Sequence, residues 1–301
     1  MANKRYVCID IEMSKMTATE KRLIHGLTKE TIQIGAVMLD ENFNCISKFQ
    51  TYVKPVFSHM TSDIEELTSI HQSNLDKADD FITAFDKYCS WVGDSDITTF
   101  CWDSIDYKQL WNELYAKGKH RKDLFSYLEN FVDLQKTFCD LLHSKQRLSL
   151  DSAVEVIDEE FKGAQHDALN DAYNTAVVLH KICSCNNDDI NPIFEPLNVN
   201  AEEEEGSKEE EKEEYTTSFA SFLSPDLQKL FGYTSNVEDN SNSYSTQDEG
   251  SLEEEEESFD EEIPALSGVK AEICSKYGIP KYSLYCFCQN ISSTTSMKVE
   301  A

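Results

Sequence analysis

Three short stretches of this 301-residue chain carry carboxylates where the surrounding pattern predicts buried structure. They lie far apart in the sequence, at residues 6–12, 102–106 and 166–171. Carboxylates gathered in one place repel one another and resist the loss of water, so a fold tolerates them mainly where it binds cations. Oxygen ligands with a single histidine favour a hard divalent metal and hydrolytic chemistry. The fold is therefore constrained to one that brings three distant segments together.

Most of the negative charge lies elsewhere. Residues 202–262 contain 22 aspartates and glutamates against three lysines, which accounts for 19 of the 29 net negative charges. This composition predicts a disordered acidic tail at 198–262, after a folded domain at 1–190. An apolar island at 219–231 is a partner-binding helix, a segment that folds back on the domain, or featureless coil. Residues 263–301 have too few apolar side chains for a core and are interpreted as a C-terminal appendage of unknown structure.

The acidity limits what the chain can bind. Non-specific capture of nucleic acid depends on lysine and arginine, which displace counterions, and an acidic chain is unsuited to it. A nucleic acid held through a metal cluster is still compatible, because the cations invert the local charge. The one dense basic run, at 117–122, is either a solvated loop between helices or a contact to a phosphate backbone.

Cysteine spacing and hydropathy bear on the compartment. The ten cysteines form no CxxC pair, and the two CxC pairs, at 183–185 and 286–288, match structural zinc spacing poorly. No apolar run approaches the ~20 residues of a membrane span, and the N-terminus enters a predicted strand without a signal peptide. We therefore expect a cytoplasmic protein with reduced thiols and no membrane partner.

Apolar periodicity predicts an α/β fold over the first domain. Strands are expected at 5–11, 30–39, 45–53, 96–101 and 131–134. Helices are expected at 62–67, 77–92, 107–117, 148–161 and 167–183. Ser62 and Glu65 have the spacing of a capping box at the start of the first helix. Three strands in a meander, followed by strands that alternate with helices, predict a mixed five-stranded sheet flanked by helices.

The carboxylates fall at strand ends and at a helix start, where open α/β sheets bind ligands. Asp10 and Glu12 are two positions apart, so on a strand both side chains point to the same face. Asp106 follows a different strand, and Asp171 lies on the last predicted helix. His166 is expected in the loop that enters this helix, where a histidine can take a proton from water near neutral pH. Two divalent cations about 3.5–4 Å apart among such groups can bind both the attacking and the leaving oxygen of a phosphodiester.

The order and spacing of these motifs resemble the DEDDh 3′–5′ exonucleases of the ribonuclease H-like superfamily. Residues 7–12 match the first motif, with Asp-x-Glu at a strand end, and residues 31–37 are similar to the second strand. Residues 102–110 match the second motif in the form of the branch that resembles RNA-trimming exoribonucleases and their bacterial relatives. Residues 166–172 match the third motif, whose histidine marks the subgroup. The resemblance covers about residues 5–183.

The resemblance implies an exonuclease that releases nucleoside 5′-monophosphates from single-stranded nucleic acid. The implied ligands of two Mg²⁺ or Mn²⁺ ions are Asp10, Glu12, Asp106 and Asp171. It also implies that His166 is the general base and that Met13 contacts the terminal nucleotide.

The chain departs from the family pattern at two positions. Asp103 follows Trp102 where the family usually has glycine, so either Asp103 or Asp106 is the third ligand; the spacing from Trp102 and Leu110 favours Asp106. Ser69 replaces a common glycine. Neither departure removes a catalytic group.

Competing interpretations stay open. The form of the second motif favours RNA, and a DNA exonuclease of the proofreading or repair type is the alternative. Taken alone, Asp106 reads as a helix N-cap and His166 as a surface histidine. A different class of function is a scaffold that binds a protein partner through the acidic tail. The tail is alternatively a nucleic-acid mimic that competes for the site.

Overall fold

The computed structural model describes residues 4–24, 26–94, 97–184, 194–197, 268–291 and 297–299. The chain divides into two units, one of residues 1–205 with 265–301 and the other of residues 206–264. All the described residues belong to the first unit. The predictions of a disordered tail at 198–262 and of an apolar island within it lie outside the described residues.

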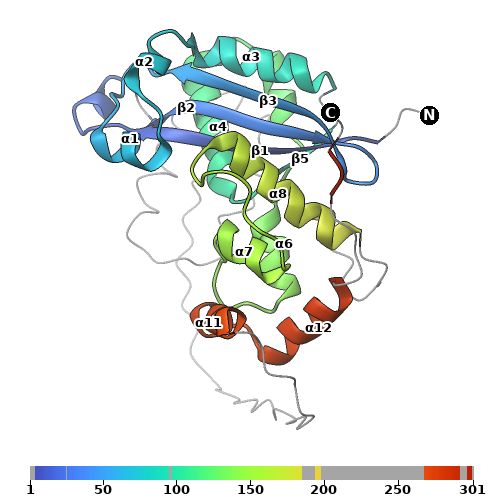
Figure 1. Cartoon of the computed structure of the whole chain (residues 1–301). Helices are drawn as coiled ribbons and strands as arrows, with labels where there is room; N and C mark the ends of the chain where they lie inside the picture. The colour runs from blue at the N-terminus through green and yellow to red at the C-terminus, as the bar shows by residue number, and fades with distance from the viewer. Residues whose placement is uncertain are drawn as a thin grey trace, which may run out of the picture. The chain divides into compact units, whose positions relative to one another are not determined.

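A mixed six-stranded sheet lies at the centre of the first unit (Figure 1). Its strands are β1 (Tyr6–Lys15), β2 (Lys29–Leu39), β3 (Cys45–Lys54), β4 (Asp79–Asp80), β5 (Thr98–Cys101) and β6 (Phe131–Asp133). The spatial order is β4-β3-β2-β1-β5-β6. The first three strands form an antiparallel meander, and β5 and β6 run parallel to β1. All five expected strands are present, and the two-residue β4 adds a sixth beside β3.

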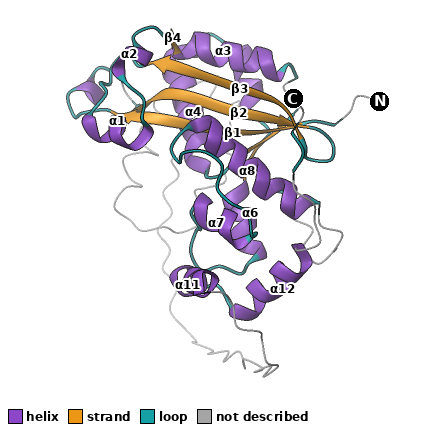
Figure 2. Ribbon diagram, viewed as in Figure 1, coloured by secondary structure: helices purple, strands orange, loops and turns teal. Residues whose placement is uncertain are grey.

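Helices cover both faces of this sheet (Figure 2). The α-helices are α1 (Ser62–Thr68), α2 (Gln72–Leu75), α3 (Phe81–Val92), α4 (Ser104–Gly118), α5 (Lys122–Phe125), α6 (Leu134–Leu141), α7 (Leu150–Val156), α8 (Ala168–Cys183), α11 (Gly268–Tyr277) and α12 (Lys281–Ile291). Two short 3₁₀ helices are η1 (Glu20–Arg22) and η2 (Ser126–Leu128). The α3 and α4 helices share one buried core with the sheet, and α6, α7 and α8 share the other.

Alternation along β1 decides which face carries the acids. Val7, Ile9 and Ile11 are buried in the core with α3 and α4, whereas Cys8 is buried in the core with α8. Because successive strand side chains point to opposite faces, Asp10 and Glu12 lie on the α8 face. The meander and the two parallel strands therefore bring the first motif beneath the helix that carries the third.

Several predicted boundaries were wrong. The first strand continues past Ile11 to Lys15, with a bulge between Glu12 and Met13. The capping box does not form, because Thr61 is the N-cap of α1 and makes no side-chain cap bond. The α4 helix begins at Ser104 and ends at Gly118, and α7 ends at Val156. Local pattern located the expected strands and helices but not all of their ends, and it missed α2, α5 and α6.

The C-terminal residues of the first unit pack onto the predicted domain. The Tyr277 hydroxyl is 2.9 Å from Ser149 Oγ, and the Phe287 ring meets the Phe138 ring edge-on at 5.5 Å. Leu197 N donates to Phe131 O at the β6 edge, and Cys45 N donates to Lys298 O. The appendage thus contributes α11 and α12 to the core around α6 and α7.

Among the described residues, no helix combines the length and the apolar character needed to cross a membrane.

Candidate active site

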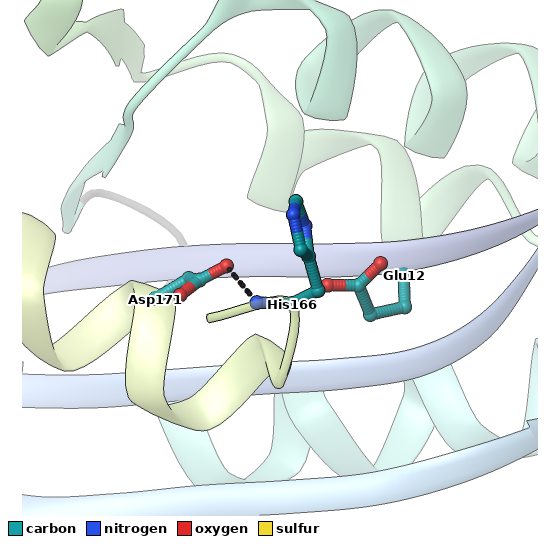
Figure 3. Close-up of side chains that lie close together, drawn as sticks. All are labelled: Glu12, His166 and Asp171. Carbon is teal, nitrogen blue, oxygen red and sulfur yellow. Dashed lines mark hydrogen bonds between the residues drawn. The ribbon is translucent and has the colours of Figure 1, made fainter. Parts of the chain in front are cut away.

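Three of the predicted site residues converge directly. One ligand atom from each of Glu12, His166 and Asp171 lies within 4.8 Å of the others (Figure 3). Glu12 is buried on β1, Asp171 is half-buried in the first turn of α8, and His166 is exposed in the loop before it. The His166 backbone N–H donates to Asp171 Oδ2 at 3.0 Å, which ties the loop to the helix. The imidazole is left facing solvent beside two carboxylates.

Asp10 and Asp106 interact electrostatically with Asp171 and so belong to the same acidic group. Burial, followed by the charges of Asp106 and Asp171, raises the pKa of Asp10 well above its ordinary value. Burial, followed by the charges of Asp103 and Asp171, does the same for the pKa of Asp106. Asp106 lies in the first turn of α4 and is 7% exposed. The structure therefore brings both carboxylates into the field of Asp171.

Burial also raises the pKa values of Glu12 and Asp171. Burial, with the charges of Asp171 and Asp106, raises the pKa of Glu12 to about 9. Burial raises the pKa of Asp171 to about 6, against the bond from the His166 N–H, which lowers it. Four carboxylates that resist ionisation together at one place need an external positive charge to ionise at neutral pH.

The donor set fits a divalent cation. Asp171 Oδ1 is buried and has no hydrogen-bond partner among the described residues. An orphaned buried carboxylate oxygen costs free energy unless a cation or a donor satisfies it. Hard oxygen donors crowded beside one imidazole are the ligands that Mg²⁺ and Mn²⁺ take. Within the part of the chain that is described, Glu12, His166 and Asp171 are the group with metal-ligand spacing.

Asp103 and Asp106 have different places in the structure. Asp103 Oδ1 accepts the Ile105 N–H at 3.0 Å and so caps α4. The interpretation of Asp106 as the N-cap was therefore wrong. Asp103 is a capping neighbour, while Asp106 is buried and has a pKa raised by burial and by the charges of Asp103 and Asp171. This geometry favours Asp106 as the third ligand, in line with its spacing from Trp102.

A polar clamp that the sequence reasoning missed holds the loop of the third motif. Gln33 is fully buried on β2, its Oε1 accepts the Ala168 N–H at 3.0 Å, and its Nε2 donates to Asp167 at 3.2 Å. Gln50 Nε2 donates to Asp167 at 3.0 Å, and Asp167 caps α8. His166, next to Asp167, has a φ of 63°. An uncharged polar residue inside an apolar strand was the signal that could have revealed Gln33.

A glycine lets α8 approach the sheet. Gly35 pairs with Asp10 across β1 and β2. A Cβ at Gly35 would lie 2.1 Å from the Ala168 carbonyl carbon and from Leu169 N. Only a residue without a side chain therefore allows α8 to begin directly over Asp10.

A buried ion-pair network fixes α4. Lys117 Nζ lies 2.5 Å from Glu30 Oε1 and 2.6 Å from Glu113 Oε1, and both carboxylates are fully buried. Glu113 also accepts the Thr31 backbone N–H at 2.8 Å. Of the basic run at 117–122, Lys117 is thus part of the interior, and Arg121 pairs with Asp86 and Asp123. These two residues are therefore not wholly solvated, and a contact of the run with a phosphate backbone stays a prediction.

Met13 lies immediately after the β-bulge and packs, half-buried, against the core of α3 and α4. Its contact with a terminal nucleotide stays a prediction.

A protein-family model described as "Exonuclease" (RNase_T) matches residues 7–179. Mouse "ERI1 exoribonuclease 2" is 26% identical over 181 residues, which are 52% of this chain and 26% of that protein. "3'-5' exonuclease crn-4" of Caenorhabditis elegans is 24% identical over 166 residues, 51% of this chain and 56% of its own length. The chain thus spans about a quarter and about half of these two relatives.

The fold also has solved counterparts. The nuclease domain of 3'hExo, described as a DEDDh family member bound to rAMP, has a TM-score of 0.52 at 18% identity. The likeness covers 65% of this chain and 98% of that domain.

Proposed function

Because the chain belongs to the exonuclease family, we propose that it hydrolyses phosphodiester bonds from the 3′ end of single-stranded nucleic acid and releases nucleoside 5′-monophosphates. The observation that supports this most directly is the convergence of Glu12, His166 and Asp171 within 4.8 Å, beside the half-buried Asp10 and the buried Asp106. A set of buried acids with raised pKa values next to one histidine has little value for stability and is suited to catalysis.

The roles follow from the environment of each group. Asp10, Glu12, Asp106 and Asp171 would hold two Mg²⁺ or Mn²⁺ ions, which supply charge neutralisation at the attacking and leaving oxygens of a phosphodiester. His166 is exposed and its backbone N–H is bonded to Asp171, which supports a role as the base that takes a proton from the attacking water. Asp167, Gln33 and Gln50 hold the loop on which His166 lies.

RNA is the favoured substrate within this proposal. The mouse relative is named an exoribonuclease, and the Trp102-to-Asp106 spacing has the form of the RNA-trimming branch. Discrimination between RNA and DNA depends on contacts to the sugar 2′-hydroxyl, which the substrate-bound enzyme would make.

The test is digestion of matched RNA and DNA strands that carry a 5′ label, with Mg²⁺ and with chelator. The wild-type protein should shorten RNA stepwise only when the metal is present, and the Asp10→Ala protein should not. Activity retained by Asp10→Ala would overturn the assignment. DNA shortened as fast as RNA would remove the RNA preference and leave the exonuclease.

A further inference from the structure

A half-exposed arginine lies beside the acidic site. Arg147, in the loop between α6 and α7, has a side chain that is 49% exposed. Its Nη1 donates to Asp133 Oδ2 at 2.7 Å and to Gln135 Oε1 at 2.9 Å. The same nitrogen is 3.8 Å from Asp103 Oδ1. The guanidinium therefore bridges the residues that follow β5 and those that end β6.

The topology places this guanidinium at the same edge of the sheet as the site. The β1, β5 and β6 strands are parallel neighbours, so their carboxyl ends share one edge. Asp133 ends β6, and Asp103 is the N-cap of α4, the helix that follows β5 and carries Asp106. Arg147 thus contacts the residue that ends β6, which lies one strand further from β1 than β5, the strand that precedes Asp106.

The loop is fixed against the second motif. The Leu148 carbonyl accepts Trp102 Nε1 at 3.1 Å and Gln135 Nε2 at 2.7 Å. Leu148 is fully buried, and Trp102 directly precedes Asp103. Leu148 is thus held by two hydrogen bonds, and the Arg147 guanidinium beside it is held by its own bonds to Asp133 and Gln135.

The donors of the guanidinium are unequally used. Both hydrogens of Nη1 are committed to Asp133 and Gln135, whereas Nε and Nη2 bond to none of the described residues. An arginine carries five donors in a planar fork, and two of them in parallel match two oxygens of a phosphate. The inner edge of the fork is thus anchored to the protein, and the outer edge is half in solvent.

The charge around the site explains what such a group can bind. Two divalent cations would balance the charges of Asp10, Glu12, Asp106 and Asp171. Asp103 would still repel a polyanion that approaches over the start of α4. Lys117 and Arg121 face other carboxylates and do not offset this. Arg147 neutralises the buried Asp133 and keeps donors for a further anion.

We propose that Arg147 binds a backbone phosphate of the substrate strand on the 5′ side of the scissile bond, and so forms a phosphate subsite next to the metal centre. This rests on the proposed exonuclease function. The subsite makes substrate length matter: a strand with an upstream phosphate gains a charge-assisted contact that a mononucleotide ester lacks.

The experiment must separate substrate binding from the neutralisation of Asp133. We therefore compare Asp133→Asn with the double variant Asp133→Asn/Arg147→Ala, because neither leaves a buried unpaired carboxylate at 133. Each is assayed with Mg²⁺ on an RNA oligonucleotide and on the p-nitrophenyl ester of a nucleoside 5′-monophosphate, which has no upstream phosphate. Equilibrium binding of a fluorescent strand in Ca²⁺ gives a readout that needs no turnover.

The double variant should raise KM and Kd for the oligonucleotide about tenfold relative to Asp133→Asn, with kcat and ester hydrolysis unchanged. The slope of log Kd against log salt should fall by about 0.7, the value for one phosphate contact on a single strand. Arg147→Lys should restore the slope and part of the affinity. Equal losses on the oligonucleotide and the ester, or an unchanged Kd and salt slope, would overturn the subsite. A wild-type protein that binds the strand through Arg147 and hydrolyses neither substrate would refute the proposed function alone.

Discussion

Gly35→Ala is the substitution that most directly tests how the site is assembled. The added Cβ would lie 2.1 Å from backbone atoms of Ala168 and Leu169, and ordinary contact begins at 3.4 Å. The start of α8 must therefore move from β2 by about 1.3 Å, because neither backbone can rotate away. His166 and Asp171 lie on either side of this contact, so both shift relative to Glu12. A displacement of about 1 Å in a catalytic group costs on the order of 100-fold in rate.

The assay is single-turnover release of a labelled 3′ nucleotide as a function of Mg²⁺ concentration. We expect kcat to fall about 100-fold and half-saturation to need more Mg²⁺. Overpacking should also lower the free energy of unfolding by about 1–3 kcal/mol, so activity is measured well below Tm. Gly268→Ala is the matched control, since a Cβ there has nothing within 4 Å. A folded Gly35→Ala protein with activity within a factor of two of wild type would refute the reasoning.

Three further predictions concern stability. Ser69 is the C-cap of α1 and has a left-handed backbone, with φ 58°. Ser69→Gly should therefore raise the free energy of unfolding by about 1 kcal/mol and Tm by about 2–4 °C. An unchanged or lower Tm would contradict this. The pKa of Glu12 is raised from 4.5 to about 9, so the metal-free native state binds more protons than the unfolded chain. Stability without metal should fall as pH rises from about 4.5 to 9, and Mg²⁺ should flatten the slope; a metal-free Tm that rises over that range would count against the buried acid cluster. Phe287 is 2% exposed and packs on Phe138. Phe287→Ala should therefore lower the free energy of unfolding in urea by about 3–5 kcal/mol. An almost unchanged free energy would mean that the C-terminal helices are only loosely attached.

Features that depend on residues close together along the chain could be predicted from the sequence. The strand before Asp10 and the helix that carries Asp171 follow from periodicity, and the pairing of Asp10 with Glu12 on one face follows from a period of two. The three acidic stretches could be associated because their chemistry needs a common cation. Their ligand roles stay a proposal.

The contacts that could not be predicted join residues that are far apart in the sequence. Gln33 and Asp167 are separated by 134 positions, and Thr31 and Glu113 by 82. No local pattern distinguishes a buried Glu113 from a solvated one, because its burial depends on Lys117 and on the Thr31 N–H. By sequence Asp106 is the plausible cap and Asp103 an alternative ligand, whereas the start of α4 at Ser104 makes Asp103 the cap.

The attachment of the C-terminal helices changes the topology of the acidic stretch. Leu197 is bonded to the β6 edge and α11 begins at Gly268, and both belong to the first unit, so described structure of that unit flanks residues 198–267 on both sides. A chain cut there at an engineered protease site should yield two fragments that copurify, since the contacts of Tyr277 and Phe287 hold them together. A variant without the acidic residues must keep a linker long enough to join Leu197 to Gly268, or α11 will not pack on the domain.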